Sequence, residues 1–476
     1  MATQILEDQV TRTPQRILFW MLLVVVAWLP IPLGSNRGWS WSLMELLIFV
    51  LAAGLIVVHM MGRMPLPRIL RKHGLLYVLL AVWIVYHLFQ TFPMQLNTLG
   101  SLSPTSIELY RYLLGDNLPS SLPLSLDQGE TLQAFLKAAA YIILFLLTIT
   151  LVNSRQRLNQ LAMLIVYVGT AEALFGLVNV YTNGQLWHFA QNDRFGRVVT
   201  GTFINRNHFA GLMEMVIPLA LGLILAQKKQ QQFYPSFKAR LRGWMSFLLS
   251  GQSRLYLYVL IMFAALFMSV SRGGVLSLFA ALTVGIILLR LIGRGGSSDA
   301  HVGSIVLLLV FSAALWFGVD GLVHRLEKGG IESSRGQILA ATYPLISDYA
   351  MFGSGAGVYE WIFPLYKTPE LGHLIYDHAH NDYAELLADQ GIVGFILLAL
   401  PLLLIYKRLL KELTVCHDPL RRGVLFGVIC GTMSMLIHAF ADFNFHIPSN
   451  AAYFWCLLGM GIAATNIRHR RRVQHK

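Results

Sequence analysis

Long apolar segments recur along the whole chain and limit what it can fold into more than any other feature. Segments such as 17–33, 43–61 and 135–152 contain almost no charged residue, and a helix of roughly 20 apolar residues crosses a bilayer. Only 13% of the 476 residues are charged, against about 25% in soluble proteins. The sequence therefore predicts an all-α polytopic integral membrane protein with about twelve transmembrane helices. The predicted spans are 17–33, 43–61, 74–92, 133–152, 159–180, 205–226, 254–270, 273–290, 304–319, 384–406, 421–441 and 447–467.

The net charge of +13 does not indicate a nucleic-acid partner, because the basic residues are spread over short segments between apolar runs rather than gathered on one soluble face. The positive-inside rule places such segments in the cytoplasm. Most of the 37 Lys and Arg lie on the cytoplasmic side if both termini are cytoplasmic, and this is the predicted orientation. The first apolar run lacks a small-residue cleavage site and is predicted to be retained as a helix.

Two outward-facing segments are too long to be simple turns. We expect a single membrane domain over residues 1–476, with a first periplasmic loop at 93–132 and a larger one at 320–383, before the tenth helix. In the larger loop, the periodicity of Ser334–Ala350 predicts an amphipathic helix at the membrane interface. The glycine-rich segment Phe352–Val358 predicts a flexible bend after it.

Arginines on the outward side are informative, since short outer loops tend to exclude them. Arg197, Arg272 and Arg335 all lie at predicted outer helix ends or loops. A guanidinium group stays protonated and matches two phosphate oxygens at once, so converging arginines suit a lipid diphosphate. The alternative is that each arginine only reaches a phospholipid headgroup.

A second group of polar residues lies in 376–385, at the predicted start of the tenth helix. Asp382 can cap this helix and Glu385 can complete a capping box, which would explain both without catalysis. His380 lies just before the helix, where the positive helix end disfavours an imidazolium and a neutral ring can accept a proton. Alternatively, Asp377, His378, His380 and Asp382 could bind a metal ion, but the arginines already offer the charge compensation that a metal would supply.

Further polar residues lie in or beside the apolar spans. The outer turn between the last two predicted helices, within 438–448, contains Asp442 and is explained most simply as satisfying the helix ends. Lys137, Glu172 and Glu214 lie in or near spans, where charges are functional candidates. The sequence shows no obvious partner for these three residues.

At these residues the chain resembles the O-antigen ligase and polymerase superfamily of bacterial envelope glycosyltransferases. The family's histidine motif is matched by His380 and Asn381, then nine residues, Gly391, two residues and Gly394. The stretch 197–207 and the turn around Arg272 are similar to its arginine positions, and the resemblance covers about residues 190–460. It implies a C-type glycosyltransferase fold in the inner membrane, with a periplasmic active site and no cofactor or metal ion. It also implies His380 as the general base and Arg197, Arg272 and Arg335 as diphosphate ligands, with support from Asn381, Asn207, Glu385, His378 and Asp442.

The resemblance further implies that a glycan is transferred, with inversion, from an undecaprenyl-diphosphate-linked donor to a glycan or lipid-linked sugar acceptor. Membrane lipids are the remaining expected partners. The turn at 442–448 gives a slight preference for polymerisation of surface polysaccharide repeat units over ligation of O-antigen to the lipid A core. A transporter of lipid-linked sugars is a third possibility, but transporters usually place their polar groups near the bilayer midplane. Here the candidates lie at outer helix ends, which favours an enzyme.

Overall fold

The structure is a computed structural model that describes residues 2–64, 73–115, 117–186, 198–227, 236, 238, 251–292 and 334–467. Its main elements are helices, as the apolar composition predicts, and its sheet is a two-stranded antiparallel pair, β1 (Met94–Gln95) with β2 (Ser121–Leu122). The helices of the first half are α1 (Ala2–Trp28), η1 (Leu33–Ser35), α2 (Gly38–Met60), α4 (Gly74–Thr91), α5 (Leu96–Leu102), α6 (Pro104–Leu114), α7 (Gln128–Leu151), α8 (Arg155–Tyr181) and α9 (Arg206–Leu225). Those that follow are α11 (Gly251–Met268), α12 (Arg272–Leu291), α14 (Ser334–Asp348), α15 (Tyr359–Ile362), η3 (Phe363–Leu365), η4 (Pro369–Leu371), α16 (Asp382–Val415), α17 (Pro419–His438), η5 (Asn444–His446) and α18 (Pro448–Asn466).

The all-α membrane fold is confirmed. Eight of the described helices are long and apolar enough to cross a membrane: α2, α4, α7, α8, α9, α12, α16 and α17. Shorter apolar helices lie at Pro14–Trp28 and Ser253–Met268, and α18 occupies the last predicted span. Each predicted span thus has a helix at its position, except 304–319, which lies outside the described residues.

Some helix ends differ from the predicted ones for local reasons. The first helix stops at Trp28 rather than at residue 33, because Pro30 and Pro32 lack the backbone N–H groups that would continue it. The helix predicted from residue 133 already begins at Gln128, where the Asp127 side chain accepts a hydrogen bond from the Glu130 N–H. Polar capping residues therefore extend this helix beyond its apolar run.

Helix α9 forms the centre of the bundle and packs most extensively against α17. Nearly all of its side chains are buried. Gly222 of α9 and Gly423 of α17 lie backbone to backbone, and a Cβ atom on either would overlap the other's carbonyl oxygen. Closer to the start of α9, a Cβ on Gly431 would lie 2.6 Å from the Met215 carbonyl oxygen. Small residues along such a contact let two membrane helices approach closely, so the start of α9 lies near the end of α17.

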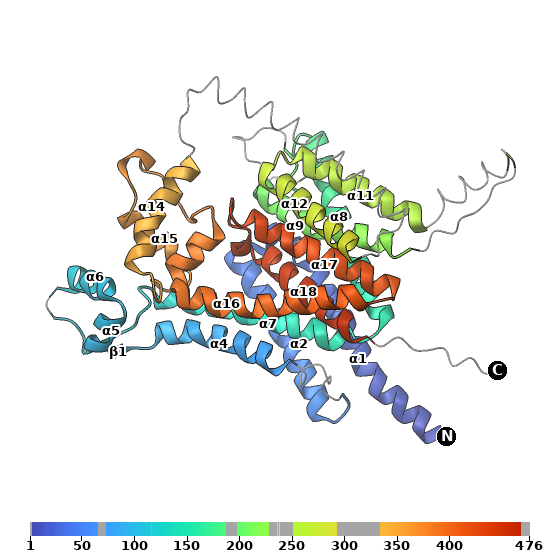
Figure 1. The fold of residues 1–476 in the computed structure, drawn as a ribbon. Coiled ribbons are helices and arrows are strands. Elements are labelled where there is room, and N and C mark those ends of the chain that lie inside the picture. The colour runs from blue at the N-terminus through green and yellow to red at the C-terminus, as the bar shows by residue number, and fades with distance from the viewer. Residues whose placement is uncertain are drawn as a thin grey trace.

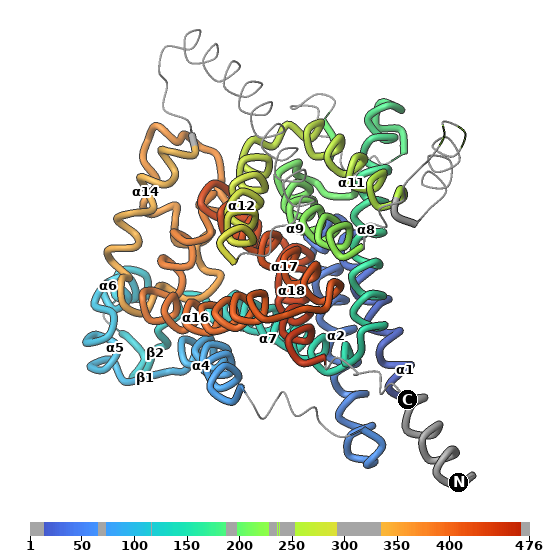
Figure 2. The backbone as a smooth tube through the Cα atoms, turned by 45° about the vertical axis from the view of Figure 1, so that its right-hand side comes forward, coloured from blue at the N-terminus to red at the C-terminus, as the bar shows by residue number. Residues whose placement is uncertain are grey.

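The two segments predicted to be long outer loops form folded structure at one end of the bundle, which we call the loop end. In Figures 1 and 2, α5, α6, α14 and α15 gather at one end of α4, α7 and α16. A hydrogen bond from Leu126 N–H to the Ser354 carbonyl joins the two loop regions directly. Residues 320–333 lie outside the described residues, so the described part of the larger predicted loop begins at Ser334.

The predicted helix in the larger loop is confirmed as α14. Its buried residues Ile338, Ala341 and Leu345 pack in a small hydrophobic core with Tyr359 and Phe363. The glycine-rich segment does bend, and backbone N–H groups of Ser354 and Gly355 bond to the carbonyls of Ala388 and Asp389 in α16. The bend is therefore held against the helix that begins at the candidate site.

Candidate functional site

The turn between α17 and α18, residues 439–447, lies at the loop end and brings several predicted site residues together. At its centre is Asp442, whose side chain has no exposed surface. Oδ1 lies 3.2 Å from His380 Nδ1 and accepts a hydrogen bond of 3.0 Å from Phe443 N–H. Oδ2 lies 3.3 Å from Arg335 Nη2 and accepts a hydrogen bond from Asn207 Nδ2. We call Asp442, His380, Arg335 and Asn207 the Asp442 cluster.

His380 lies just before α16, as predicted, but the helix cap differs. The cap is Asn381, whose side-chain oxygen accepts hydrogen bonds of 3.1 Å from the N–H groups of Tyr383 and Ala384. The predicted capping box of Asp382 and Glu385 is therefore wrong. Asn381 Nδ2 also donates to the Phe440 carbonyl, at 3.2 Å, which ties the start of α16 to the turn. His380 itself has a positive φ of 52°, so its backbone redirects the chain at this point.

Arginines from separate helices surround the Asp442 cluster. Arg335 donates from Nη1 to the Ala441 carbonyl at 2.9 Å in addition to its ion pair with Asp442. Arg272 is the first residue of α12 and is exposed. Arg206 is the first residue of α9, is half-buried, and experiences the positive charges of Arg272 and Arg335. Arg197 lies outside the described residues. Two of the three predicted arginines therefore border this site, and Arg206 is a third that sequence reasoning overlooked, although it lies in the same stretch as Asn207.

The glycines after Arg272 let α12 begin directly against the end of α17. A Cβ on Gly273 would lie 2.6 Å from His438 Nε2, and one on Gly274 would lie 2.7 Å from Ala210 Cβ. His438 is held from its other side, where Nδ1 lies 3.2 Å from Glu214 Oε1 and 3.1 Å from Asn444 Nδ2. Glu214 thus has a partner that sequence spacing could not show, and the pair helps to set the position of Arg272.

The other two charged residues predicted within spans also have partners. Glu172 accepts hydrogen bonds from the backbone N–H and the hydroxyl of Thr202, at 2.9 and 3.0 Å, which anchors the segment leading to α9. Lys137 donates to Gln133 Oε1 at 3.0 Å and lies 4.0 Å above the ring of Trp41. Neither Glu172 nor Lys137 contacts the Asp442 cluster, so neither belongs to this candidate site.

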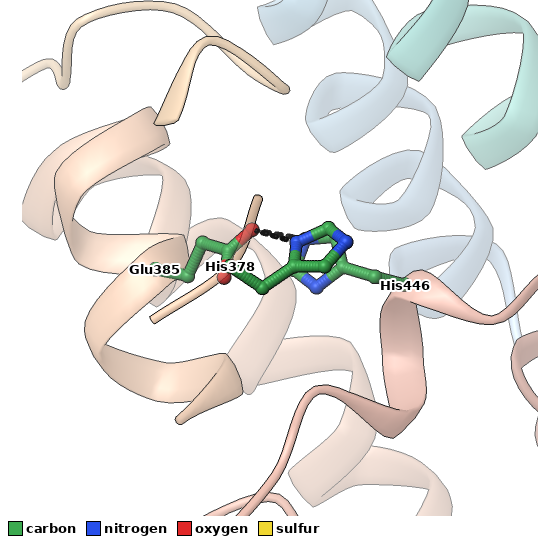
Figure 3. A group of neighbouring side chains, drawn as sticks. All are labelled: His378, Glu385 and His446. Atoms are coloured by element: carbon green, nitrogen blue, oxygen red, sulfur yellow. Dashed lines mark hydrogen bonds and ion pairs between the residues drawn. The ribbon is translucent and has the colours of Figure 1, made fainter. Parts of the chain in front are cut away.

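A second polar cluster lies beside the first and consists of His378, Glu385, His446 and Asp382, which we call the Glu385 cluster. Figure 3 shows His378 and His446 meeting the Glu385 carboxylate from two chain segments. Glu385 Oε1 lies 2.8 Å from His378 Nδ1 and 3.1 Å from His446 Nε2. Asp382 Oδ1 lies 3.0 Å from His446 Nδ1. The four residues considered as metal ligands from the sequence do not all come together, because His380 lies beside Asp442 and His446 lies beside His378 instead.

Phe443 separates and packs the two clusters. Its ring stacks on His378 with centroids 4.3 Å apart and meets His380 edge to face at 4.9 Å. On its remaining side it contacts His208 at 4.7 Å. This one aromatic side chain therefore fixes the rings of both clusters relative to each other.

The electrostatic environment of the turn differs between the two clusters. Burial alone would raise the pKa of Asp442, but the hydrogen bond from His380 and the charge of Arg335 outweigh it and hold the pKa well below its usual range. Burial lowers the pKa of His446, but the carboxylates of Glu385 and Asp382 outweigh that effect and raise it to about 9. Asp442 is thus a permanent anion, and the position of His446 favours positive charge.

The structure explains why both glycines of the histidine motif, Gly391 and Gly394, lack a side chain. Gly391 has a φ of 61° and interrupts the helical conformation of α16. A Cβ there would overlap the backbone of Met351. Gly394 lies against α4, where a Cβ would be 3.1 Å from Tyr86 Cε1. The motif therefore combines polar residues of the site with the glycines that seat α16 against the glycine-rich bend and α4.

The Asp442 cluster can orient a base beside cations. Asp442 engages Nδ1 of His380, so a neutral ring carries its proton on Nδ1 and leaves the lone pair of Nε2 free. The side chain of His380 is 24% exposed, which gives a reactant access to it. The arginines beside it suit an anion with several oxygens.

Comparison with known proteins gives a family for part of this chain. Residues 257–399 match the family model described as O-antigen ligase. The matched region includes Arg272, Arg335, His380 and Asn381, whereas Asn207 and Asp442 lie outside it. No curated protein matches the chain.

Proposed function

We propose that this chain belongs to the O-antigen ligase and polymerase superfamily, whose O-antigen ligase model its residues 257–399 match, and that it transfers a glycan from undecaprenyl diphosphate to a sugar hydroxyl at the Asp442 cluster. The observation that carries the proposal is the meeting of His380, Arg335 and Asn207 on one buried carboxylate. These residues come from three separate parts of the chain. Their convergence gives a single place for both a base and an anionic leaving group.

In the proposed step, His380 is the general base. Nε2 takes the proton of the acceptor hydroxyl while its oxygen attacks the anomeric carbon of the donor sugar, and the bond from that carbon to the diphosphate oxygen breaks. The attack from the opposite side inverts the configuration of that carbon. Asp442 holds Nδ1 and stabilises the imidazolium that forms, as a carboxylate does for a catalytic histidine in other enzymes.

The arginines stabilise the charge that develops on the departing diphosphate. Arg272 and Arg335, with Arg206, offer guanidinium groups beside His380, and donors placed where charge develops act in the transition state. We assign Arg197 to the same group on the basis of its place in the motif. Because these cations compensate the charge, the transfer step as proposed uses no metal ion and no cofactor.

The site is proposed to face the periplasm, with the chain in the inner membrane of a bacterium. At the end of the bundle opposite the site, α16 ends and α17 begins with a concentration of basic residues: Lys407, Arg408, Lys411, Arg421 and Arg422. The positive-inside rule assigns this end to the cytoplasm. The loop end is then periplasmic and both termini are cytoplasmic.

Among acceptors, we favour another lipid-linked repeat unit, so that the reaction polymerises a surface polysaccharide. The basis is the turn at 442–448, which supplies Asp442 and His446 to the two clusters. Ligation to the lipid A core is the alternative within the same chemistry. A lipid-linked sugar transporter is less favoured, because the polar groups gather at helix ends rather than at the middle of the spans.

The test is a transfer assay with the full chain in phospholipid nanodiscs, an undecaprenyl-diphosphate-linked oligosaccharide as donor, and either the same molecule or lipid A core as acceptor. His380→Ala should lower kcat by about 10² to 10⁴, the usual contribution of general base catalysis. His373→Ala, an exposed histidine in the same segment, is the matched control. Full activity of the folded His380→Ala variant would remove His380 as the base, and the product, a ladder of repeats or a glycosylated core, distinguishes the two acceptors.

A further inference from the structure

The Glu385 cluster has the geometry of a three-ligand metal site. The ligand atoms of His378, Glu385 and His446 all lie within 4.8 Å of one another. Two sides of this triangle, from Glu385 Oε1 to the two ring nitrogens, measure 2.8 and 3.1 Å. Ligands about 2.1 Å from a tetrahedral zinc ion are about 3.4 Å apart, so these two sides would have to open by about 0.6 and about 0.3 Å to admit an ion.

The groups behind these ligands are those that orient metal ligands. His446 contributes Nε2 to the triangle, and its other nitrogen, Nδ1, lies 3.0 Å from Asp382 Oδ1. Metal-bound histidines usually donate their second N–H to a carboxylate in this way. The second oxygen of Glu385 accepts a hydrogen bond of 2.9 Å from Ala379 N–H, so the carboxylate is held with Oε1 turned toward the two rings.

The charges of the cluster also favour a divalent cation. Glu385 and Asp382 are two carboxylates with 3% and 6% exposure. The rings of His378 and His446 are stacked with centroids 4.6 Å apart, so both rings face the same pair of carboxylates. A divalent ion bound between them would carry the charge that balances two carboxylates.

From this geometry we propose that His378, Glu385 and His446 bind one transition-metal ion of the zinc class, with Asp382 orienting His446. Two imidazoles and a carboxylate are ligands that zinc accepts. The histidine side chains are 27% and 30% exposed, which leaves room for a water molecule as the fourth ligand.

The ion would act as a positioning element for the neighbouring site. It joins three parts of the chain: the segment before α16 through His378, α16 through Glu385, and the α17–α18 turn through His446. His380 follows His378 by two residues and Asp442 precedes His446 by four. The ion would therefore fix the two chain segments that carry His380 and Asp442. It takes no part in the proposed transfer step, and its binding is measurable without any substrate.

The experiment uses the full chain in detergent, purified through an affinity tag that contains no histidine. The protein is dialysed against a chelator, loaded with Zn²⁺ or Co²⁺ and freed of excess metal. Metal content is measured by mass spectrometry, and the visible absorption of Co²⁺ reports its coordination without any variant. We expect about one equivalent per chain, a Co²⁺ band typical of tetrahedral geometry, and a higher Tm in the loaded protein.

Two ligand variants and two control variants then test which residues bind the ion. His378→Ala and His446→Ala should each reduce bound metal at least tenfold, whereas His373→Ala and His380→Ala should retain it. Substoichiometric metal in the loaded wild-type chain would overturn the proposal and leave His446 as a protonated bridge between the two carboxylates. Metal retained in both ligand variants would overturn the assignment of the site. A failure of the glycan transfer assay would leave this result unchanged, so the two proposals are tested separately.

Discussion

Replacing Asp442 with asparagine is the sharpest test of how the site is built. All four of its partners donate to it: His380 Nδ1 and Phe443 N–H at Oδ1, and Arg335 Nη2 and Asn207 Nδ2 at Oδ2. An asparagine offers one oxygen and one NH₂ group. Whichever way the amide is turned, its NH₂ group faces two donors.

The consequence depends on the orientation of the amide. If the NH₂ group faces His380, the ring must accept at Nδ1 and carry its proton on Nε2, which then has no lone pair for the acceptor hydroxyl. If it faces Arg335 and Asn207, the ion pair that holds the arginine is lost. The first orientation removes base catalysis, which corresponds to about 10² to 10⁴ in kcat, or about 2.7 to 5.4 kcal/mol of activation free energy.

A loss of stability accompanies this change. Hydrogen bonds to charged groups contribute about 1.5–3 kcal/mol each, and the substitution removes two of them, so the free energy of unfolding should fall by about 3–6 kcal/mol. The measurement is therefore kcat and KM in nanodiscs below the Tm of the variant, with Tm measured on the same preparation. Asp377→Asn, an exposed carboxylate in the segment before α16, is the matched control.

The decisive quantity is kcat under conditions where the variant is folded. A fall of two or more orders of magnitude, with Asp377→Asn unchanged, is the expected outcome. If folded Asp442→Asn turned over at the wild-type rate, the orientation of His380 by Asp442 would have no role in the reaction, and the base would have to be sought elsewhere.

Two further predictions follow from the site and its supports. Arg272→Lys should lower kcat/KM about tenfold or more, because a single ammonium cannot reproduce the paired contacts of guanidinium with a diphosphate. Arg111→Lys, on the exposed loop helix α6, is the control. Wild-type kinetics for Arg272→Lys would mean that Arg272 contacts only lipid headgroups. Gly391→Ala should lower Tm and kcat together. The Met351 backbone leaves no room for a Cβ, and the backbone conformation of Gly391, φ 61° and ψ −172°, is adopted essentially by glycine alone and costs another residue about 1–3 kcal/mol. An unchanged Tm would show that the break in α16 can move to another residue.

The membrane fold could be predicted well from the sequence because its signal is local. A stretch of apolar residues long enough to cross a bilayer needs no tertiary information to be recognised. The errors lie at the helix ends, where Pro30 and Asp127 act through hydrogen bonding rather than hydropathy. These signals are also local, and a closer reading of turn and cap residues would have moved both ends in the right direction.

The cap of α16 shows where local reasoning has a limit. Asn381 and Asp382 are neighbours and both are good capping residues. The choice between them depends on His446, which engages Asp382 from 64 residues away and leaves the capping position to Asn381. A tertiary contact therefore settles a question that the local sequence leaves open.

The members of the Asp442 cluster could be named from the sequence, but their meeting point could not. Chemistry and family resemblance single out His380 and Arg335, and the resemblance adds Asn207 and Asp442 only as supporting residues. Their convergence depends on α9 packing along α17, where Gly423, Gly427 and Gly431 each meet the α9 backbone. Small residues four apart indicate a close helix contact, but they do not identify the partner helix. His446 gave no signal because a lone histidine in a short turn usually serves the helix ends.

Positive charge gathers at one end of the bundle, which argues that the site binds an anion from one side of the membrane only. Helices α9, α12 and α16 all begin here, and each helix start carries partial positive charge that adds to the charges of Arg206 and Arg272. The buried carboxylates at this end are already engaged: Asp442 by four donors, and Asp382 and Glu385 by His446 and His378. The arginines and the helix starts lie at one end of the bundle, where they suit the diphosphate of the proposed donor. A carrier that releases its cargo on both sides would need such groups near the middle of its spans.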